Sequence, residues 1–474
     1  MSIGSVPLTD LAPLAVMLPV LGAAVTFMLV RRPRAQITVT VSALVLTLVL
    51  DALLLAAVWD TGVAAVHLGG WPAPLGISLV VDRLSALMLV VSALITLAVL
   101  LYASAQGLIN RDEGGPVSIF HPTFLILVAG VSNAFLAGDL FNLYVGFEIL
   151  LTSSYVLLTM GGTAQRIRAG ITYVVVSVLS SVVFLIAIAM IYAATGTVNM
   201  ADLAVKLGEL PTDVQMVLHV LLLVGFGIKA AVFPLSFWLP DSYPTAPAPV
   251  TAVFAGLLTK VGVYAMIRTE TLLFPGEHVN ALLLVVAALT MVVGILGALA
   301  QTDIKRILSF ILVSHIGYMI FGLGLATEAG LAATVYYVAH HITVQTALFL
   351  ITGRVLEHYQ SGAQTRRVAA LLAAQPTPFV EVHPLLAHRL GIEEGDQLDL
   401  RTARATVTAP ARITDRVRPD TVFMPFHFAG AGSVNRATND AVDPISSMPE
   451  FKVCAVDVAA STTDLVPEPL EVSA

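Results

Sequence analysis

The chain has 474 residues, of which 57% are hydrophobic and only 12% are charged, and its mean hydropathy is +0.89. A soluble globular protein carries about 25% charged residues, so this composition excludes an ordinary soluble enzyme. The net charge of −7 and the lack of a basic stripe exclude a nucleic-acid-binding protein. A single cysteine, Cys454, excludes a disulfide framework, a cysteine zinc site and a cysteine-ligated iron–sulfur cluster. A membrane protein with several spans remains.

Eleven stretches of the front part of the chain are long and apolar enough to cross a bilayer, which takes about 20 mostly apolar residues. They cover 13–30, 36–58, 80–102, 119–136, 139–160, 168–194, 214–238, 248–267, 279–299, 306–325 and 329–352. Three arginines follow the first stretch without a small-residue cleavage site, so we expect it to remain as a span. The sequence thus predicts an all-α polytopic membrane unit of about eleven helices.

Lysine and arginine residues fall unevenly on the two sets of alternate loops. One set holds eleven of them, and the other holds only Arg83, Lys206 and Arg268. Loops rich in lysine and arginine stay in the cytoplasm. We therefore expect a multi-pass protein of the cell membrane with its N-terminus outside. With an odd number of spans, the C-terminal domain is then cytoplasmic.

Several ionisable side chains lie inside the predicted spans, although each costs about 3 kcal/mol at the bilayer centre on insertion scales. They are Glu148, Lys229, Lys260, His340 and His341, with Asp51 and His315 as further candidates. Asp51 and Asp139 are expected near span ends. One interpretation is structural: the side chain reaches the interface or forms a fixed pair. The other is functional: burial favours neutral forms and an opposite charge favours charged ones, so a Glu/Lys pair whose spacing changes can take up and release a proton.

The seventh stretch favours the functional interpretation. Lys229 is followed by Pro234, and four more prolines lie between residues 240 and 249. Proline breaks a helix, and membranes tolerate the freed carbonyls mainly where the backbone is buried in protein or lines a wet cavity. A broken helix beside an intramembrane lysine is typical of transporter ion sites.

The residues around these charges resemble a known family. The run Lys229-Ala-Ala-Val-Phe-Pro-Leu-Ser-Phe-Trp-Leu-Pro-Asp241, the segment 257–264 and His340-His341-Ile-Thr-Val-Gln-Thr-Ala-Leu-Phe349 carry the likeness, together with 76–88 and the helix around Glu148. Over about 1–365 the chain resembles the proton-translocating antiporter-like subunits, which include the D subunit of the Mrp multisubunit Na+/H+ antiporter and the large membrane-arm subunits of respiratory complex I. The Mrp D-subunit type is the most similar.

The resemblance implies a fold of two inverted five-helix repeats with a broken seventh helix, and a role for each charge. Glu148 and Lys229 would form the central pair of a proton path, Lys260 its next relay, and His341 and His340 the following step. The chain departs from the family at Gln345, where many relatives have lysine. It also leaves the family pattern after the eleventh helix, so we expect a truncated antiporter-like fold.

The rest of the chain has the composition of a soluble domain. Residues 376–474 carry 22 charged side chains, against 33 in the whole of 1–375. Leu398 and Leu400 alternate with charged neighbours, which is typical of a strand, and the glycines at 391 and 395 predict a helix stop and a turn. We expect a membrane domain over 1–367, a junction over 368–378, a small β domain over 379–458 and a disordered tail over 459–474.

This second part resembles another family. The segments 379–384, 390–396, 426–440 and 448–455 look like the C-terminal molybdopterin-dinucleotide-binding domain of assimilatory nitrate reductase-type oxidoreductases, a double-psi β-barrel. The resemblance implies molybdopterin guanine dinucleotide as cofactor of the tail and none for the membrane domain. The residues carried over as its contacts are His427, Asn435, Asn439, Asp440 and Lys452. From composition alone, the polar loop 433–440 is more typical of turns.

The leading hypothesis is a proton-conducting subunit of a multisubunit cation (Na+)/H+ antiporter, fused to a fragment of a molybdoenzyme. It makes the chain a transporter subunit rather than an enzyme, with other antiporter subunits, H+, Na+ and the lipid bilayer as partners, no nucleic acid and no metal site. One alternative is a proton-pumping membrane-arm subunit of NADH-quinone oxidoreductase (complex I). An alternative of another class is a membrane-anchored molybdopterin-binding fragment, although eleven helices with buried charges exceed what an anchor needs.

Overall fold

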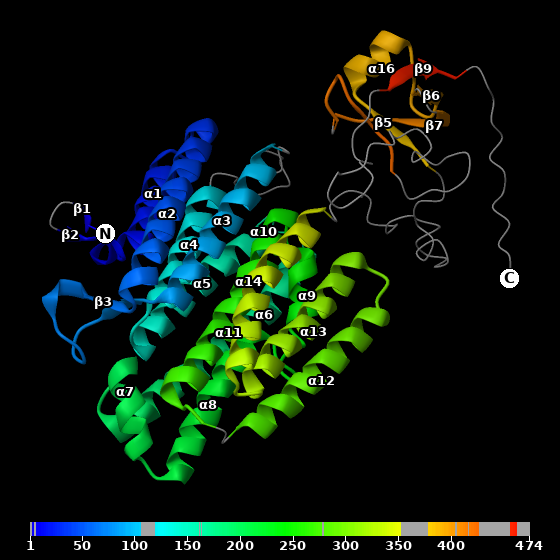
Figure 1. Cartoon of the computed structure of the whole chain (residues 1–474). Helices are drawn as coiled ribbons and strands as arrows, with labels where there is room; N and C mark the ends of the chain where they lie inside the picture. Colours follow the sequence, from blue (N-terminus) through cyan, green and yellow to red (C-terminus); the bar gives the residue numbers. More distant parts are fainter. Residues whose placement is uncertain are drawn as a thin grey trace. The chain divides into compact units, whose positions relative to one another are not determined.

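The computed structural model describes residues 2–3, 6–105, 119–160, 162, 164–276, 279–351, 378–402, 405–415, 417–425 and 456–461. The chain divides into two compact units, Met1–Gly353 and Arg354–Ala474. The first unit consists mainly of helices (Figure 1), and the described part of the second contains a β-sheet. The predicted combination of a helical membrane unit and a C-terminal β region is therefore confirmed.

Each of the eleven predicted stretches overlaps a helix. Ten of them overlap, in chain order, α1 (Leu14–Met28), α2 (Pro33–Thr61), α3 (Arg83–Ala105), α4 (Phe120–Leu136), α5 (Leu140–Thr159), α6 (Ala164–Thr195), α8 (Thr212–Ala230), α12 (Asn280–Leu299), α13 (Ile304–Gly324) and α14 (Glu328–Ile351). Nine helices in the described part of the chain are long and apolar enough to cross a membrane. Because α4 has only 17 residues and α14 carries more polar side chains, the number of eleven spans stays a prediction.

Small elements gather at one end of the helices. The hairpin of β3 (Ala64–His67) and β4 (Ser78–Val81) and the short helix α7 (Met200–Lys206) lie there (Figure 1). Isolated bridges join Leu79 to Ala137 and Asp139 to Asn199, so the start of α5 is fixed to both elements. Asp139 caps α5, as expected for a residue at a span end, by accepting a hydrogen bond from the Asn142 amide at 2.6 Å. The N-terminus adds β1 (Ser2–Ile3), β2 (Val6–Pro7) and the turn η1 (Leu8–Leu11).

Asp51 does not lie near a span end, contrary to the prediction. Helix α2 is 29 residues long, so this carboxylate sits well inside it, fully buried. Neither of its oxygens has a hydrogen-bond partner among the described residues. The predicted span was too short at its C-terminal side because Trp59, Asp60 and Thr61 continue the helix beyond the apolar run.

The seventh predicted span breaks directly after Lys229, as the prolines predicted. Helix α8 ends at Ala230, not at residue 238, because Ala231 adopts the left-handed conformation with φ of 58°. The carbonyl of Ile228 accepts from the Ala231 amide at 3.2 Å and from the indole of Trp238 at 3.1 Å, so the end of the helix is satisfied by backbone and side chain together. The short helix α9 (Leu239–Ser242) and the turn η5 (Tyr243–Thr245) then lead into the next span.

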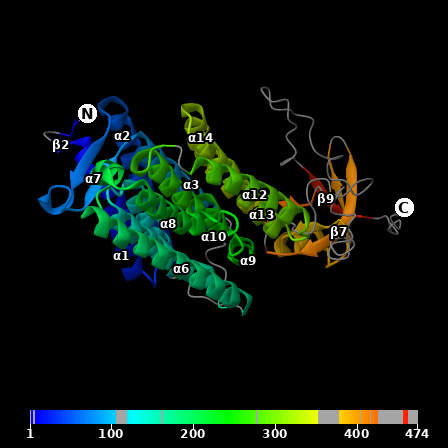
Figure 2. The same ribbon diagram turned by 90° about the horizontal axis from the view of Figure 1, so that it is seen from below.

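That next span is one continuous but irregular helix. It consists of α10 (Ala248–Val253), the π-helical turn η6 (Phe254–Leu258), α11 (Thr259–Arg268) and a second π-helical turn, η7 (Thr269–Leu273). Its most apolar window is completely buried. Gly262 permits this close packing, since a Cβ there would lie 2.8 Å from the Ala230 backbone nitrogen. Helices α12 and α13 follow and run side by side (Figure 2).

The described part of the second unit is a five-stranded sheet in the order β8-β5-β7-β6-β9. The strands are β5 (Val380–Val382), β6 (Gln397–Arg401), β7 (Thr406–Ile413), β8 (Val422–Phe423) and β9 (Asp457–Ala460), with helix α16 (Pro384–Leu390) after β5. Strands β5 and β7 are parallel, and the other pairs are antiparallel. Gly391 ends α16 with φ of 67°, as predicted. Strand β9 includes two residues, 459 and 460, that the sequence analysis placed in the disordered tail.

Candidate functional site

The centre of the candidate site is a chain of three side chains from three helices. Glu148 comes from the middle of α5, Ser181 from α6 and Lys229 from the last turn of α8. The Ser181 hydroxyl donates a hydrogen bond to Glu148 Oε1, and Lys229 Nζ donates to Ser181 Oγ at 2.9 Å. The predicted pair is thus joined through a hydroxyl group, which the sequence analysis did not identify.

Lys229 is held in an almost dry environment. The residue is 7% exposed, and Nζ also lies 3.4 Å from the Ser177 carbonyl and 5.6 Å from the centre of the Phe147 ring. A cavity of about 20 Å³, lined by Lys229, Ser177 and Ser180 among others, borders the site and has room for about one water molecule. Taking an ammonium group out of water costs several kcal/mol, so its charge depends on the partners that remain. A change at Glu148 therefore acts directly on the proton affinity of this lysine.

The expected second lysine lies beyond the break in α8. Ala230, next to Lys229, packs against Gly262, two residues after Lys260. Lys260 is fully buried, and its Nζ donates to the Ala255 carbonyl at 2.6 Å. Ala255 belongs to the π-helical turn η6, and such a turn exposes carbonyls that a regular α-helix would use itself. The turn thus supplies the hydrogen-bond acceptor for the buried ammonium group.

A histidine cluster adjoins Lys260. His341 on α14 is 1% exposed, and its ring centre lies 4.8 Å from that of His315 on α13. The Tyr337 hydroxyl is hydrogen-bonded to His315 Nδ1 at 2.6 Å. Lys260 is close enough to interact electrostatically with both histidines. Neither ring nitrogen of His341 has a hydrogen-bond partner among the described residues.

The two adjacent histidines of α14 differ in environment. His340 is exposed, and its ring stacks beside Tyr336 with the centres 6.1 Å apart. The structure therefore brings Lys260 together with His341 and His315, while His340 faces away. Gln345, at the position where the family pattern has lysine, is buried and donates to the Leu308 carbonyl at 3.1 Å. The hydrogen bond from the Gln345 side-chain amide thus holds α14 against α13.

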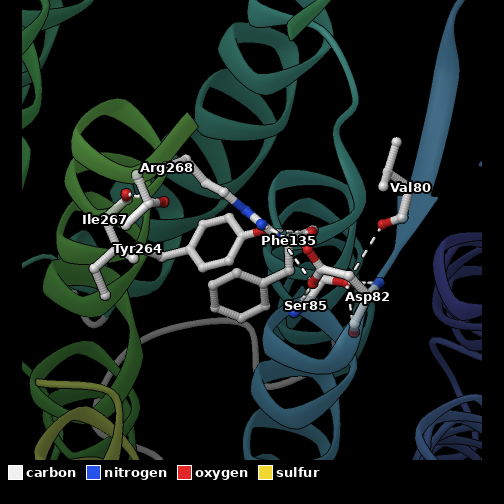
Figure 3. A network of polar contacts seen from close by, with 8 residues as sticks. Val80, Asp82, Ser85, Phe135, Tyr264, Ile267 and Arg268 are labelled. Atoms are coloured by element: carbon white, nitrogen blue, oxygen red, sulfur yellow. Dashed lines mark hydrogen bonds and ion pairs between the residues drawn. The ribbon is translucent and has the colours of Figure 1, made fainter. Parts of the chain in front are cut away.

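A second polar network closes the end of the unit that carries the hairpin (Figure 3). Arg268 forms two contacts with the Asp82 carboxylate, of 2.6 and 2.7 Å, and its Nε donates to the Tyr264 hydroxyl at 3.0 Å. That hydroxyl donates in turn to the Phe135 carbonyl at 2.7 Å. Asp82 and Ser85 exchange backbone-to-side-chain hydrogen bonds in a capping arrangement at the start of α3. The network ties α11 to α3 and α4.

The expected cofactor contacts of the tail, His427, Asn435, Asn439, Asp440 and Lys452, lie outside the described residues. The described sheet provides only the scaffold of that region. Among the described residues, no group of three or more histidine, cysteine, aspartate and glutamate side chains could hold a metal ion.

The residues that connect the predicted charges were not predicted from the sequence. Ser181 belongs to a cluster with Ser177 and Ser180 in an otherwise apolar span, and this clustering was a usable signal. The contact of Arg268 with Asp82 had no such signal, because both residues were placed in loops or at span ends. Asp82 and Arg268 are 186 positions apart in the chain.

Comparison with known proteins gives two family matches. A profile described as "NADH:quinone oxidoreductase/Mrp antiporter, TM" matches residues 137–387. A second, described as "Molydopterin dinucleotide binding domain", matches residues 348–455. Among curated proteins, the D subunit of the Na(+)/H(+) antiporter of Alkalihalophilus pseudofirmus is 40% identical over 373 residues, which cover 78% of this chain and 74% of that protein.

Solved structures agree with the first of these matches. A chain of the Mrp complex from a Dietzia species superposes with a TM-score of 0.69 at 35% identity, and the match covers 74% of this chain and 65% of that one. This chain thus spans slightly less than two thirds of the length of that relative. A chain of respiratory complex I from Thermus thermophilus superposes with a TM-score of 0.62 at 26% identity, covering 74% of this chain and 72% of that one.

Proposed function

Because this chain belongs to the NADH:quinone oxidoreductase/Mrp antiporter family and its membrane unit is of the proton-conducting antiporter D-subunit type, we propose that protons cross it through Glu148, Ser181 and Lys229. The buried hydrogen-bonded chain of these three side chains, directly before the break in α8, is the observation that carries the proposal. Lys260 and His341 continue the route.

The mechanism follows from the charges. A proton that binds the Glu148 carboxylate removes the negative charge that stabilises the Lys229 ammonium group in its dry site. Lys229 then releases its own proton towards the Lys260 side and becomes neutral. The Ser181 hydroxyl next accepts the proton of Glu148 while it gives its own to the Lys229 amine. This last transfer restores the carboxylate and the ammonium group, and one proton has advanced by one site.

Replacing the central lysine tests this function. In vesicles from cells that make the full chain together with its co-assembled subunits, Lys229→Ala should abolish Na+-driven proton movement. Lys206→Ala is the matched control, because Lys206 is 40% exposed on α7 and pairs there with Asp202 at 3.0 Å. Proton movement that persists unchanged in Lys229→Ala would falsify the assignment.

A second candidate function is that of a complex I membrane-arm subunit. The matching profile covers both kinds of protein, and the Thermus thermophilus complex I chain shares the fold. In that case, proton movement in the vesicles would follow oxidation of NADH and would not respond to a Na+ gradient. The higher identity to the antiporter D subunit favours Na+/H+ exchange, with other antiporter subunits as partners.

The proposed orientation places the N-terminus outside and the C-terminal unit in the cytoplasm. Two basic residues support it. Arg306 pairs with Asp241 at 3.0 Å, and Arg166 donates to the Thr245 carbonyl at 3.1 Å, so both bind the segment after the break in α8. An epitope added after Ala474 should be cleaved by protease in inside-out vesicles and protected in right-side-out ones.

The C-terminal unit contains a molybdopterin dinucleotide-binding domain by its profile match, and we propose molybdopterin guanine dinucleotide as its ligand. His427, Asn435 and Asp440 are the proposed contacts, together with Asn439 and Lys452. Molybdenum should then copurify with the full chain in proportion to protein. A chain made in cells that cannot synthesise the cofactor is the control.

A further inference from the structure

A second buried acid–base pair lies outside the route described above. His219 on α8 and Glu270 in the π-helical turn η7 approach to 2.6 Å between Nε2 and Oε1. Their side chains are only 3% and 7% exposed. The imidazole stacks on Phe274 with the ring centres 4.4 Å apart and the planes within 6°. This packing holds the histidine in one orientation towards the carboxylate.

The backbone is arranged to present Glu270 to the histidine. In η7 the Phe274 amide donates to the Thr269 carbonyl at 2.9 Å, which is an i to i+5 hydrogen bond. A π-helical turn inserts one extra residue into the helix, and such turns occur frequently at functional sites. The same span uses its other π-helical turn, η6, to provide the acceptor for Lys260. The two irregular turns of this helix thus each serve one buried ionisable group.

The pair lies between the lysines and one end of the helical unit. Helices α8 and α11 run antiparallel, because Ala230 meets Gly262 while His219 meets Glu270. His219 is ten residues before Lys229, and Glu270 is ten residues after Lys260. Ten residues of helix correspond to about 15 Å. The pair therefore stands about 15 Å from the two lysines, towards the end formed by α7 and the hairpin.

Three charged groups near the pair among the described residues, one on its own span and two on the packed helix α7, are engaged elsewhere. Arg268, two residues before Glu270, is bound by Asp82. On α7, Lys206 and Asp202 contact each other at 3.0 Å. Histidine and glutamate are thus matched to each other, and either one alone would be an uncompensated buried group.

We propose that His219 and Glu270 form a second proton-carrying pair, which connects the two lysines to the membrane surface at the α7 end. This rests on the proposed function of the lysine route. At rest the pair shares one proton between Nε2 and Oε1. A proton released from the lysines binds the pair, giving an imidazolium and a carboxylic acid. Release of one proton to the surface then restores the shared-proton state, so charge and protons balance.

A double variant separates this role from a structural one. Glu270→Gln and His219→Gln should each lower Na+-driven proton movement in the vesicles at least about 10-fold. The single variants should also lower the thermal stability of the solubilised chain, because each leaves its partner buried and unpaired. The double variant has no buried charge, so its stability should return to that of the wild type while transport stays low. The matched control is Asp202→Asn with Lys206→Gln, which should transport normally.

The outcomes are distinguishable. Recovery of both stability and transport in the double variant would mean that the pair is only a structural contact, and the proposal would be wrong. If Lys229→Ala transports normally in the same vesicles, the lysine route itself fails; if it is inactive while the double variant is normal, only the second pair fails.

Infrared spectroscopy of the purified wild-type chain provides an independent measurement. It does not depend on whether a variant that lacks the pair still folds. Loading with protons should produce a carboxylic C=O band that shifts in Glu270→Asp, which keeps the acid. A spectrum with no such band would overturn the proposal.

Discussion

Replacing Ser181 by alanine tests the hydroxyl that joins the two central charges. The wild-type hydroxyl donates to Glu148 and accepts from Lys229 Nζ at 2.9 Å. A hydrogen bond to a charged group contributes about 1.5–3 kcal/mol. If alanine removes one such bond from the transfer step, the barrier rises by that amount, which corresponds to about a 10- to 150-fold lower rate. We therefore expect proton movement in vesicles to fall within this range.

Two further variants isolate the hydroxyl. Ser181→Thr keeps it and should transport at close to the wild-type rate. Ser180→Ala removes the same volume at the adjacent position, where the hydroxyl donates to the Gly225 carbonyl at 2.9 Å. It loses only a neutral hydrogen bond, which contributes about 1 kcal/mol to stability, and its transport should change little.

The refuting result is a Ser181→Ala variant that transports like the wild type. It would mean that Glu148 and Lys229 exchange protons directly, or through water in the neighbouring cavity of about 20 Å³. Slowing of Ser180→Ala to the same degree would be equally damaging, because the loss would then reflect packing of α6.

Three other changes have definite expected outcomes. Asp82→Asn removes the counter-charge of the part-buried Arg268, and loss of its charge-assisted hydrogen bonds should lower the free energy of unfolding by about 1.5–3 kcal/mol in a thermal assay of the solubilised chain. Gly262→Ala places a Cβ 2.8 Å from the backbone of α8 and should destabilise the chain by about 1–3 kcal/mol in the same assay. In the sheet of the second unit, the Thr408 hydroxyl donates to Asp399 at 2.8 Å and holds the pKa of that carboxyl below its usual value. A carboxyl whose pKa is lowered in the folded state stabilises the fold at pH values above its unfolded-state pKa of about 3.9. Hydrogen exchange in β6 should therefore be faster in Asp399→Asn at pH 7, and the difference should vanish once the pH falls below the folded-state pKa.

The sequence was sufficient to predict the helical unit and its central charges, because both have a large energetic signature. An apolar stretch of span length has few alternative structures in a bilayer, and a lysine inside it is expensive enough to indicate function. Glu148 and Lys229 were found on that basis, and Pro234 predicted the break in α8 that the structure contains. In the second unit, Leu398 and Leu400 identified β6 by their alternation.

Features with a small energetic signature were harder to predict. Serine is tolerated in membrane helices, so Ser181 alone carries little information, and only its clustering with Ser177 and Ser180 could have indicated the position. The π-helical turns follow from tertiary packing and have no composition of their own. His340 and His341 could not be told apart, because consecutive residues of a helix differ by about 100° in direction and only the packing of α13 decides which one is buried.

The contact between Arg268 and Asp82 also limits how the eighth span can move. A π-helical turn contains one more residue than the α-helical turn that would replace it, so converting η6 to regular helix changes the register by one residue. That shift rotates the part of the helix before η6 by about 100° about the helix axis, relative to the part after it. Arg268 holds the far end of α11 in place, so α10 and the carbonyl of Ala255 would be the parts that rotate. Lys260 would then lose its hydrogen-bond acceptor although its own position is unchanged. Helix α11 would thus stay in place, and only the short segment before it would rotate.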